Sequence, residues 1–294
     1  MYKVHLANQW IHHKNRPGFE MIMAYAQSIG DWVPVQDPQQ ADIVWAPSKP
    51  EAFPNAKRIL YGPHFSVLPD HNYLSLSKSD SRLLYIQPSQ WVVQLWHDQG
   101  ANGIPIYPAP FPVDLEQFKP LSLERSKVFV YLKNRSPHEY EQVIQLLRNH
   151  GYDPVTINYG TGYNQQEYIH LLNEAIFGIW VGGLESQGFA LGEALAMNVP
   201  LLVWSVVRMD QTYGLGLEQT YSHIHTKVDT APYWDERCGV LIREASQLEM
   251  GLQDLVKGIQ ENRFRPREYI EEHLSPKGVY ERYWKPLCQI DIKA

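Results

Sequence analysis

The sequence predicts two doubly wound α/β domains that face each other across a cleft. Short apolar runs alternate with helical patterns along both halves of the 294-residue chain, and a proline-rich segment separates the halves. Such alternation is typical of a parallel sheet with helices on both faces, and the length suits one large or two ordinary domains. We expect one domain over residues 1–112, a second over 113–275, and a helical tail over 276–294 that can pack back on the first domain.

Five apolar runs in the first half are expected to be buried strands. Each is short, rich in β-branched or aromatic residues, and bounded by Pro, Gly, Asn or Asp. They are YKVHLA (2–7), WVPV (32–35), ADIVWAP (41–47), RILYG (58–62) and LLYIQPS (83–89). Residues 19–30 and 89–100 have helical spacing, and in the latter Ser89 is a natural N-cap and Gly100 a natural stop.

The segment IPIYPAPFPVDLEQFKP is expected to link the domains. Five prolines fall between Pro105 and Pro120, a density that is incompatible with a central strand or a helix interior. Asp114 followed by Gln117 is a capping-box pattern that can start one helical turn after the crossing.

The alternation resumes in the second half. The expected strands are residues 127–133, 154–160, 176–182 and 200–206, and the expected helices are 138–151, 165–175 and 189–198. Residues 267–274 and 278–287 are expected to form helices after the last strand.

Composition limits the kinds of partner. A formal charge of −6 provides no basic field that would recruit nucleic acid or anionic lipid. No apolar run is long enough for a transmembrane segment, and the start lacks the profile of a signal peptide. The two cysteines, Cys238 and Cys288, have no metal-type spacing, so neither a disulfide nor a zinc site is expected. We therefore expect a cytoplasmic protein.

The stretch GGLESQGFALGEALAMNVP carries the strongest candidate site. Gly182 and Gly183 permit a tight exit from a strand, and Gly188 opens a helix whose first amides face the carboxyl end of that strand. Such amides favour anions, phosphate above all, and they belong to Phe189, Ala190 and Leu191.

Two glutamates flank this helix start. Glu185 precedes the helix, where a bound phosphate would repel it unless it accepts hydrogen bonds from neighbouring hydroxyls. Glu193 lies further along the helix and can accept hydrogen bonds from a ribose if the side of the helix faces the ligand. The alternative is structural, because the helix dipole alone favours acidic residues near a helix start.

Residues 168–204 resemble the donor-binding segment of retaining, family 4 type glycosyltransferases of the GT-B fold. That signature is Glu, seven residues, Glu-Ala, a small-residue turn and Pro. This sequence matches it at Glu185, Gly188, Glu193, Ala194, Ala196 and Pro200. The linker resembles the family's interdomain segment at Val113, Asp114, Phe118 and Pro120. Val181 and Gly182 stand where the family has Pro-Ser, and Gln187 replaces a common aromatic residue.

The resemblance implies two Rossmann-like domains, with a nucleotide-diphosphate sugar on the second and an acceptor on the first. By this resemblance Glu185 contacts hydroxyls of the transferred sugar, Glu193 contacts the ribose, and the amides after Gly188 contact the diphosphate. Lys133 and Arg135 would be the basic pair opposite the diphosphate, although a solvated loop is the alternative.

Three further residues are candidates on the same basis. Tyr159 or Tyr163 can stack on the base, although an ordinary glycine turn is nearly as good an interpretation. His64 follows a strand of the first domain, where related enzymes keep a histidine near the transferred sugar, yet a lone histidine in a loop is more often structural.

His223 and His225 alternate as metal ligands can, but without a nearby Cys or an Asp-x-Asp motif no metal dependence is expected.

The sequence therefore predicts a glycosyltransferase of glycan biosynthesis that moves a hexosyl or pentosyl group to a hydroxyl of a glycan or small molecule. Retention of configuration is implied only by the resemblance. Two alternatives remain open: a nucleotide-sugar epimerase or other sugar-nucleotide enzyme, and a non-catalytic sugar-nucleotide-binding subunit. A dehydrogenase is disfavoured because no Gly-x-Gly-x-x-Gly follows the first strand.

Overall fold

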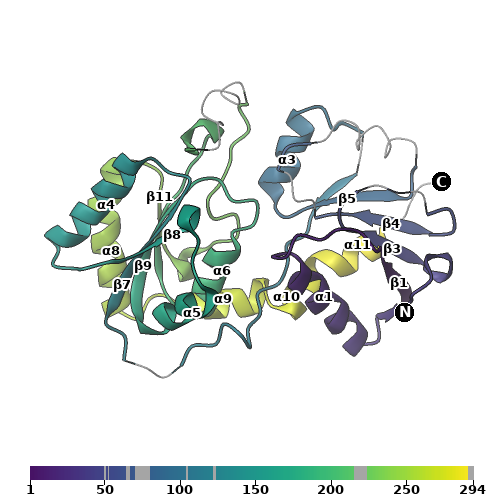
Figure 1. The fold of residues 1–294 in the computed structure, drawn as a ribbon, viewed down its shortest axis with the longest axis horizontal. Helices are drawn as coiled ribbons and strands as arrows, with labels where there is room; N and C mark the ends of the chain where they lie inside the picture. Colours follow the sequence, from purple (N-terminus) through teal and green to yellow (C-terminus); the bar gives the residue numbers. More distant parts are fainter. Residues whose placement is uncertain are drawn as a thin grey trace. The chain divides into compact units, whose positions relative to one another are not determined.

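The computed structural model describes residues 1–49, 51, 53–63, 67–69, 80–103, 105–121, 124–214 and 224–290. The chain divides into two compact units. Unit 1 comprises Met1–Pro112 together with His273–Ala294, and unit 2 comprises Val113–Glu272. Each unit contains one parallel sheet, with six strands in unit 1 and five in unit 2 (Figure 1). The predicted class, two parallel-sheet α/β domains, is confirmed.

The sheet of unit 1 has the strand order β2-β1-β3-β4-β5-β6. Its strands are β1 (Tyr2–Leu6), β2 (Trp32–Pro34), β3 (Ile43–Ala46), β4 (Arg58–Tyr61), β5 (Leu83–Gln87) and β6 (Ile106–Pro108). The first five occur where the apolar runs predict them. The sixth lies in the proline-rich segment, which was expected to be only a linker. It is an edge strand that pairs with β5 alone, where a proline costs no ladder hydrogen bond on the open side.

Helices α1 (Arg16–Ser28) and α3 (Gln90–Asp98) follow the predicted spacing in unit 1. Ser89 occupies the N-cap position of α3, but its hydroxyl makes no capping hydrogen bond. Gly100 follows the helix with φ +91°, a conformation that favours glycine, so the predicted stop is confirmed. A short 3₁₀ turn, η1 (Pro38–Gln40), precedes β3.

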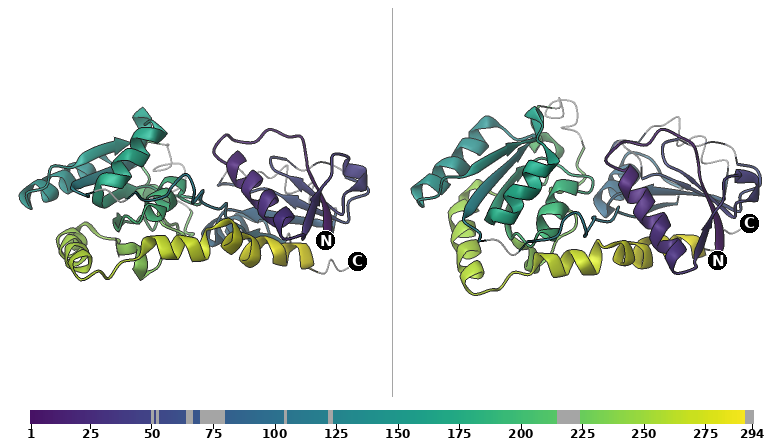
Figure 2. Two further views of the ribbon diagram at one scale, coloured as in Figure 1. Left: turned by 90° about the horizontal axis from the view of Figure 1, so that it is seen from below. Right: turned by 60° about the horizontal axis from the view of Figure 1, so that its bottom comes forward.

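The end of the chain belongs to unit 1. Helix α10 (Pro276–Val279), the π-helical turn η6 (Tyr280–Trp284) and α11 (Lys285–Gln289) follow one another, and α10 and η6 contact α1 (Figure 2). The rings of Tyr25 and Tyr280 lie 5.6 Å apart, and Trp284 packs 4.2 Å from Trp45 in the core. These aromatic contacts fix the terminal helices to the rest of unit 1.

The sheet of unit 2 has the order β11-β10-β9-β7-β8. Its strands are β7 (Lys127–Lys133), β8 (Val155–Asn158), β9 (Ala175–Gly182), β10 (Leu201–Trp204) and β11 (Gly239–Ile242). Four of them were predicted. The fifth, β11, was missed, because it begins with Gly239, a residue type that is depleted in strands. All registered neighbours are parallel, so the carboxyl ends of the strands share one edge.

Helices α4 (Pro137–Asn149), α5 (Gln165–Glu174) and α6 (Phe189–Ala196) match the prediction, as does α9 (Pro266–His273). Helix α8 (Leu248–Gln260) was not predicted, although it packs with α4 on one core. That core includes Val143, Leu147, Ile179, Leu202, Leu252 and Leu255. Residues 115–117 form the single turn expected after Asp114: the amide of Phe118 donates to the Asp114 carbonyl at 2.9 Å, and the Asp114 carboxylate accepts from the amides of Glu116 and Gln117 at 3.0 and 2.9 Å.

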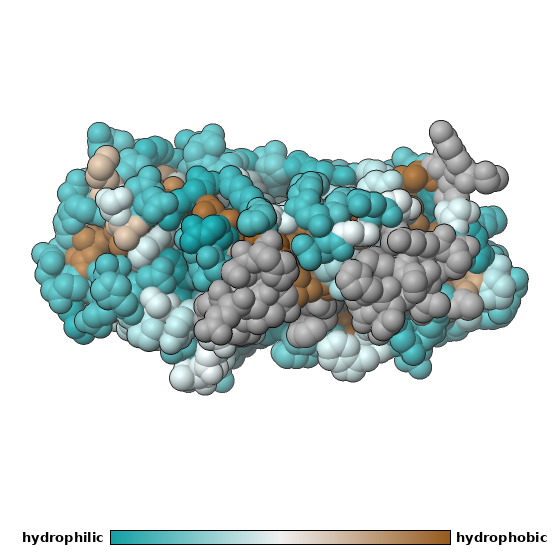
Figure 3. Space-filling model, turned by 90° about the horizontal axis from the view of Figure 1, so that it is seen from above, coloured by the Kyte–Doolittle hydropathy of each residue, from teal (hydrophilic) through white to brown (hydrophobic). Residues whose placement is uncertain are grey.

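The face drawn in Figure 3 is largely hydrophilic over the described residues, with small apolar patches between polar side chains. Within the described ranges, every helix is too short or too polar to cross a bilayer.

Candidate functional site

The candidate site lies at the carboxyl ends of β7 and β9 in unit 2. The register pairs Lys133 with Gly182, so the two central strands end side by side. From β7 the chain continues through α4 to β8 on one side, whereas β9 leads through α6 to β10 on the other. Open α/β sheets bind ligands at such a switch point, because the connections diverge there.

The exit of β9 is a glycine-dependent loop. The amide of Gly183 donates to the carbonyl of Lys133 at 2.7 Å. A Cβ at Gly183 would lie 2.8 Å from Cγ2 of Thr212 and 3.0 Å from the carbonyl oxygen of Asn134. The glycine pair therefore lets the loop after β9 pack directly against the exit of β7.

Residues that the sequence did not single out hold this loop. The amide of Leu184 donates to Oγ1 of Thr212 at 3.0 Å, and the amide of Glu185 donates to the carbonyl of Asp229 at 2.9 Å. Ser205 Oγ in turn donates to Oδ1 of Asp229 at 3.0 Å. No motif or periodicity marks these residues, because they act through hydrogen bonds that only the fold creates.

Lys133 and Glu185 form an ion pair across the two strand ends. Lys133 Nζ lies 2.7 Å from Oε1 and 2.9 Å from Oε2 of Glu185. Their side chains are 18% and 11% exposed, so water screens this pair less than a surface pair. Nζ also lies 4.4 Å from the ring centroid of Tyr159, whose residue is 49% exposed. Three residues that the sequence nominates thus meet at one point.

Arg135 has a different environment from Lys133. Its side chain is 1% exposed, and Nη1 donates to the carbonyls of Gly182 and Trp204 at 3.1 and 2.9 Å. Nε donates to Oε2 of Glu139 at 3.0 Å, and the guanidinium lies 4.7 Å from the ring centroid of Trp204. Arg135 therefore connects the carboxyl ends of β9 and β10 to the first turn of α4.

Glu139 belongs to the same network and closes a capping box with Ser136. Burial opposes ionisation of its carboxyl group, but hydrogen bonds from Arg135 and Ser136 outweigh burial and leave the pKa of Glu139 below its ordinary value. The network is consequently ionised at neutral pH.

Helix α6 begins at this edge. Its N-cap, Gly188, has φ +83° and ψ 59°, a left-handed conformation that glycine adopts at little cost. The hydroxyl of Tyr168 on α5 donates to the carbonyl of Ala190 at 2.8 Å and fixes the first turn. Amides in the first turn of a helix have no acceptor within it, and Phe189, Ala190 and Leu191 occupy that turn.

The opposite end of α6 is held by two arginines. Arg125 donates to the carbonyl of Met197 at 2.7 Å, and Arg267 donates to the carbonyl of Ala196 at 2.8 Å. Cations at a helix C-terminus complement its dipole, so α6 is fixed at both ends.

Tyr163 is half-buried beside Tyr131 and Tyr168, at ring distances of 6.1 and 5.1 Å. Burial and the nearby charge of Glu193 raise the pKa of Tyr163 to about 12. Tyr163 is thus neutral at physiological pH. Glu193 itself is half-buried on α6.

The structure describes only one of the three histidine candidates. His64 and His223 lie outside the described ranges, and His225 is exposed. Among the residues that the structure describes, no group of three or more His, Cys, Asp or Glu side chains is arranged to hold a metal ion.

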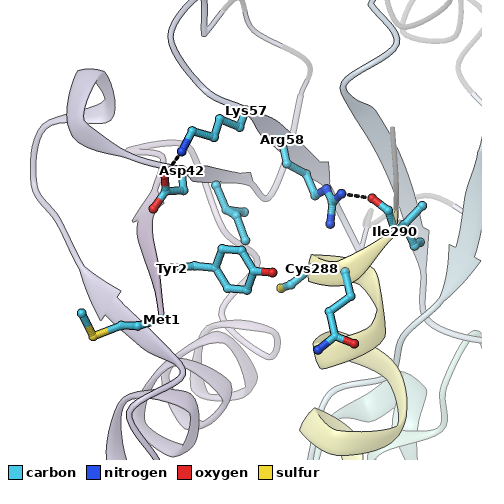
Figure 4. Close-up of a pocket in the computed structure, with 9 residues that line it drawn as sticks. Met1, Tyr2, Asp42, Lys57, Arg58, Cys288 and Ile290 are labelled. Atoms are coloured by element: carbon cyan, nitrogen blue, oxygen red, sulfur yellow. Dashed lines mark hydrogen bonds and ion pairs between the residues drawn. The ribbon is translucent and has the colours of Figure 1, made fainter. Parts of the chain in front are cut away.

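A cavity of about 440 Å³ in unit 1 lies at the amino ends of β1, β3 and β4 (Figure 4). Arg58 donates there to the carbonyls of Leu287 and Ile290 and so joins β4 to the end of α11. Lys57 pairs with Asp42 at 2.8 Å. The charged groups of this cavity therefore serve contacts within unit 1, at the edge opposite to the one where open α/β sheets bind ligands.

Comparison with known proteins gives the fold its class. No protein-family model matches the sequence, and no curated protein matches it. Solved structures do match. S. aureus TarM, as a mutant in complex with fondaparinux, α-GlcNAc-glycerol and UDP, is similar with a TM-score of 0.52 at 12% identity. The match covers 92% of this chain, which spans 58% of the TarM chain.

Sucrose-phosphate synthase from Thermosynechococcus elongatus also has a TM-score of 0.52, at 10% identity over 98% of each chain. Both neighbours are GT-B glycosyltransferases, and the two Rossmann-like parallel sheets of this chain have their fold. The assignment to family 4 and to its two-glutamate motif stays a prediction from the sequence.

Proposed function

We propose that this chain is a glycosyltransferase that moves a sugar from a nucleotide-diphosphate donor to an acceptor hydroxyl. One observation carries the proposal: Lys133 and Glu185 pair at the switch point of the unit 2 sheet, in the segment that leads into the glycine-capped start of α6. A cation, a carboxylate and helix amides are the groups needed to hold a diphosphate beside a sugar.

In this proposal the amides of Ala190 and Leu191, together with Lys133, bind the diphosphate. Glu185 accepts hydrogen bonds from hydroxyls of the transferred sugar, and Glu193 accepts from the ribose. Tyr159 is the stacking residue for the base, since its ring is half exposed and lies beside Lys133. Arg135 is assigned to positioning, because its donors are engaged by Glu139 and by strand-end carbonyls.

The transfer breaks the bond between the anomeric carbon and the diphosphate oxygen. The acceptor oxygen forms the new bond to this carbon on the same face, its proton passes to the departing phosphate oxygen, and the nucleoside diphosphate leaves. Lys133 and the helix amides would stabilise the charge that develops on the leaving phosphate. We propose retention of configuration without a metal or a covalent enzyme nucleophile, with a glycan or small-molecule acceptor on unit 1.

The test starts with thermal unfolding in the presence of a panel of nucleotide sugars. Uridine nucleotides come first, since the TarM complex contains UDP. A ligand that binds the native state raises the unfolding temperature. Donors that stabilise the protein are then assayed for release of free nucleotide with candidate acceptors.

We expect stabilisation by one nucleotide class and acceptor-dependent nucleotide release. Conversion of the donor without acceptor would instead indicate an epimerase or another sugar-nucleotide enzyme. Binding without turnover against a broad acceptor panel would indicate a non-catalytic subunit. If no nucleotide or nucleotide sugar raises the unfolding temperature, the site assignment is wrong.

A further inference from the structure

The Lys133–Glu185 ion pair has a consequence for ligand selection, which rests on the proposed function. We infer that Glu185 makes the site discriminate between an intact nucleotide sugar and a bare nucleoside diphosphate, because it competes with the diphosphate for Lys133. Glu185 is thus a specificity-determining residue that also promotes product release.

The geometry shows how closely the pair is engaged. Lys133 Nζ contacts both carboxylate oxygens of Glu185, at 2.7 and 2.9 Å, and both side chains are mostly buried. The Glu185 amide is fixed by the carbonyl of Asp229, and the Gly183 amide by the carbonyl of Lys133. The backbones of both residues are therefore held in place, and the ammonium already has an anionic partner before any ligand arrives.

A diphosphate that draws Lys133 away must break the ion pair with Glu185 in a largely buried place. Breaking a buried ion pair costs free energy, and this cost lowers the net affinity for the diphosphate. The carboxylate also repels the diphosphate through a poorly screened environment. A bare nucleoside diphosphate has no sugar hydroxyl that could hydrogen-bond to the carboxylate in place of Lys133.

An intact nucleotide sugar brings hydroxyl donors together with its diphosphate. These hydroxyls can hydrogen-bond to Glu185 at the moment when Lys133 turns to the phosphates, so both members of the pair exchange one partner for another. After transfer the sugar has left, and the pair can re-form at the expense of the product. The site consequently favours the donor over the product that it generates.

The test is isothermal titration of UDP, GDP and ADP, and of the nucleotide sugar that stabilises the protein best. The proteins are the unaltered chain and the variants Glu185→Gln, Glu174→Gln and Lys133→Met. Glu185→Gln is expected to bind the nucleoside diphosphate about tenfold more tightly, a change of about 1.4 kcal/mol, and to lose most of the preference for the sugar-bearing ligand. Lys133→Met is expected to lower the affinity for both the nucleoside diphosphate and the nucleotide sugar.

Glu174→Gln is the matched control. It removes the same charge from the same unit and also breaks a Lys–Glu pair, since Lys127 Nζ lies 2.8 Å from Oε2 of Glu174 at the amino end of β7. If loss of negative charge alone tightened binding, Glu174→Gln would do so as well. The double variant Lys133→Met/Glu185→Gln completes a cycle in which the gain from Glu185→Gln must be smaller than it is with Lys133 present, since the contested cation is absent and only the direct repulsion is relieved.

The inference is overturned if folded Glu185→Gln binds the nucleoside diphosphate no more tightly than the unaltered chain does, while that chain binds both ligands. It is also overturned if the gain is undiminished without Lys133. Failure of every protein to bind any nucleotide would contradict the proposed function instead. Should Glu185→Gln not fold, Glu185→Asp serves, since its shorter side chain weakens the pair and an intermediate gain is expected.

Discussion

Lys133 Nζ lies 2.7 Å from Oε1 of Glu185, although the two residues are 52 positions apart in the sequence. They meet because β7 and β9 are parallel neighbours that end in register. Lys133 is the residue proposed to bind the diphosphate, and Glu185 is the residue proposed to bind the sugar hydroxyls. Substituting each in turn therefore tests the two roles separately.

Glu185→Ala is expected to abolish transfer while the fold stays intact, with kcat reduced at least about 100-fold, since interactions made in the transition state act mainly on kcat. Lys133→Ala is expected to weaken donor binding and so to raise KM, in addition to lowering kcat through the loss of a cation at the leaving phosphate. Steady-state kinetics with the donor found in the panel, alongside thermal unfolding of each variant, separates the two effects. Full activity in Glu185→Ala would remove this residue from the site.

Arg135→Lys is expected to destabilise unit 2 by about 2–4 kcal/mol, because an ammonium cannot reproduce the planar set of donors that a buried guanidinium supplies. Denaturant unfolding measures the loss. Arg148→Lys is the control, since Arg148 is exposed on α4, the helix that follows Arg135, and should change the free energy of unfolding by less than about 0.5 kcal/mol. Equal effects of the two substitutions would argue against the positioning role.

Tyr168→Phe removes the hydroxyl that donates to the carbonyl of Ala190 at 2.8 Å. We expect a loss of about 1 kcal/mol in the free energy of unfolding and weaker nucleotide binding, because the first turn of α6 is less firmly held. Tyr140→Phe removes a tyrosine hydroxyl that lies 2.6 Å from Oγ1 of Thr156 at an exposed position. Nucleotide affinity should be unchanged in that control, and a similar loss in both variants would contradict the link to α6.

The Arg135–Glu139 contact gives stability a pH dependence. The pKa of Glu139 is lowered from an ordinary value of 4.5, because the hydrogen bonds from Arg135 and Ser136 outweigh the opposing effect of burial. The Glu139 carboxylate is thus protonated less readily in the folded state than in the unfolded state. Its contribution to the free energy of unfolding is present above pH 4.5 and is lost as the pH falls below that value. Unfolding temperatures of the unaltered chain and of Glu139→Gln should converge in this acid range. If the difference between the two unfolding temperatures stayed constant down to low pH, the Glu139 carboxylate would not be the source of the pH dependence.

The sequence anticipated strands that are apolar and bounded by turn residues, because burial on both faces of a parallel sheet leaves that pattern. It missed β11, which is short and begins with a glycine, and β6, whose proline content is permitted only by its place at the sheet edge. Helix α8 was also missed, although its apolar positions pack against the strands and α4.

For the site, glycines and glutamates in one local segment were sufficient to nominate the strand exit, the helix start and the carboxylate before it. Local residues set backbone freedom and charge, and these can be read without a fold. The partners of those residues come from separate strands and loops: Asp229 and Thr212 hold the loop, while Tyr168 holds the helix. Sequence spacing carries no signal for such contacts.

The sequence by itself determined two α/β units and the chemistry of a segment suited to anions and hydroxyls, because periodicity, glycine placement and charge are local properties. Only the tertiary structure decided that Lys133 is paired with Glu185 while Arg135 is committed to Glu139 and to carbonyls of β9 and β10. Lys133 is the last residue of β7 and Arg135 lies two residues beyond it, and the direction in which each side chain leaves the sheet edge is set by the neighbouring strands.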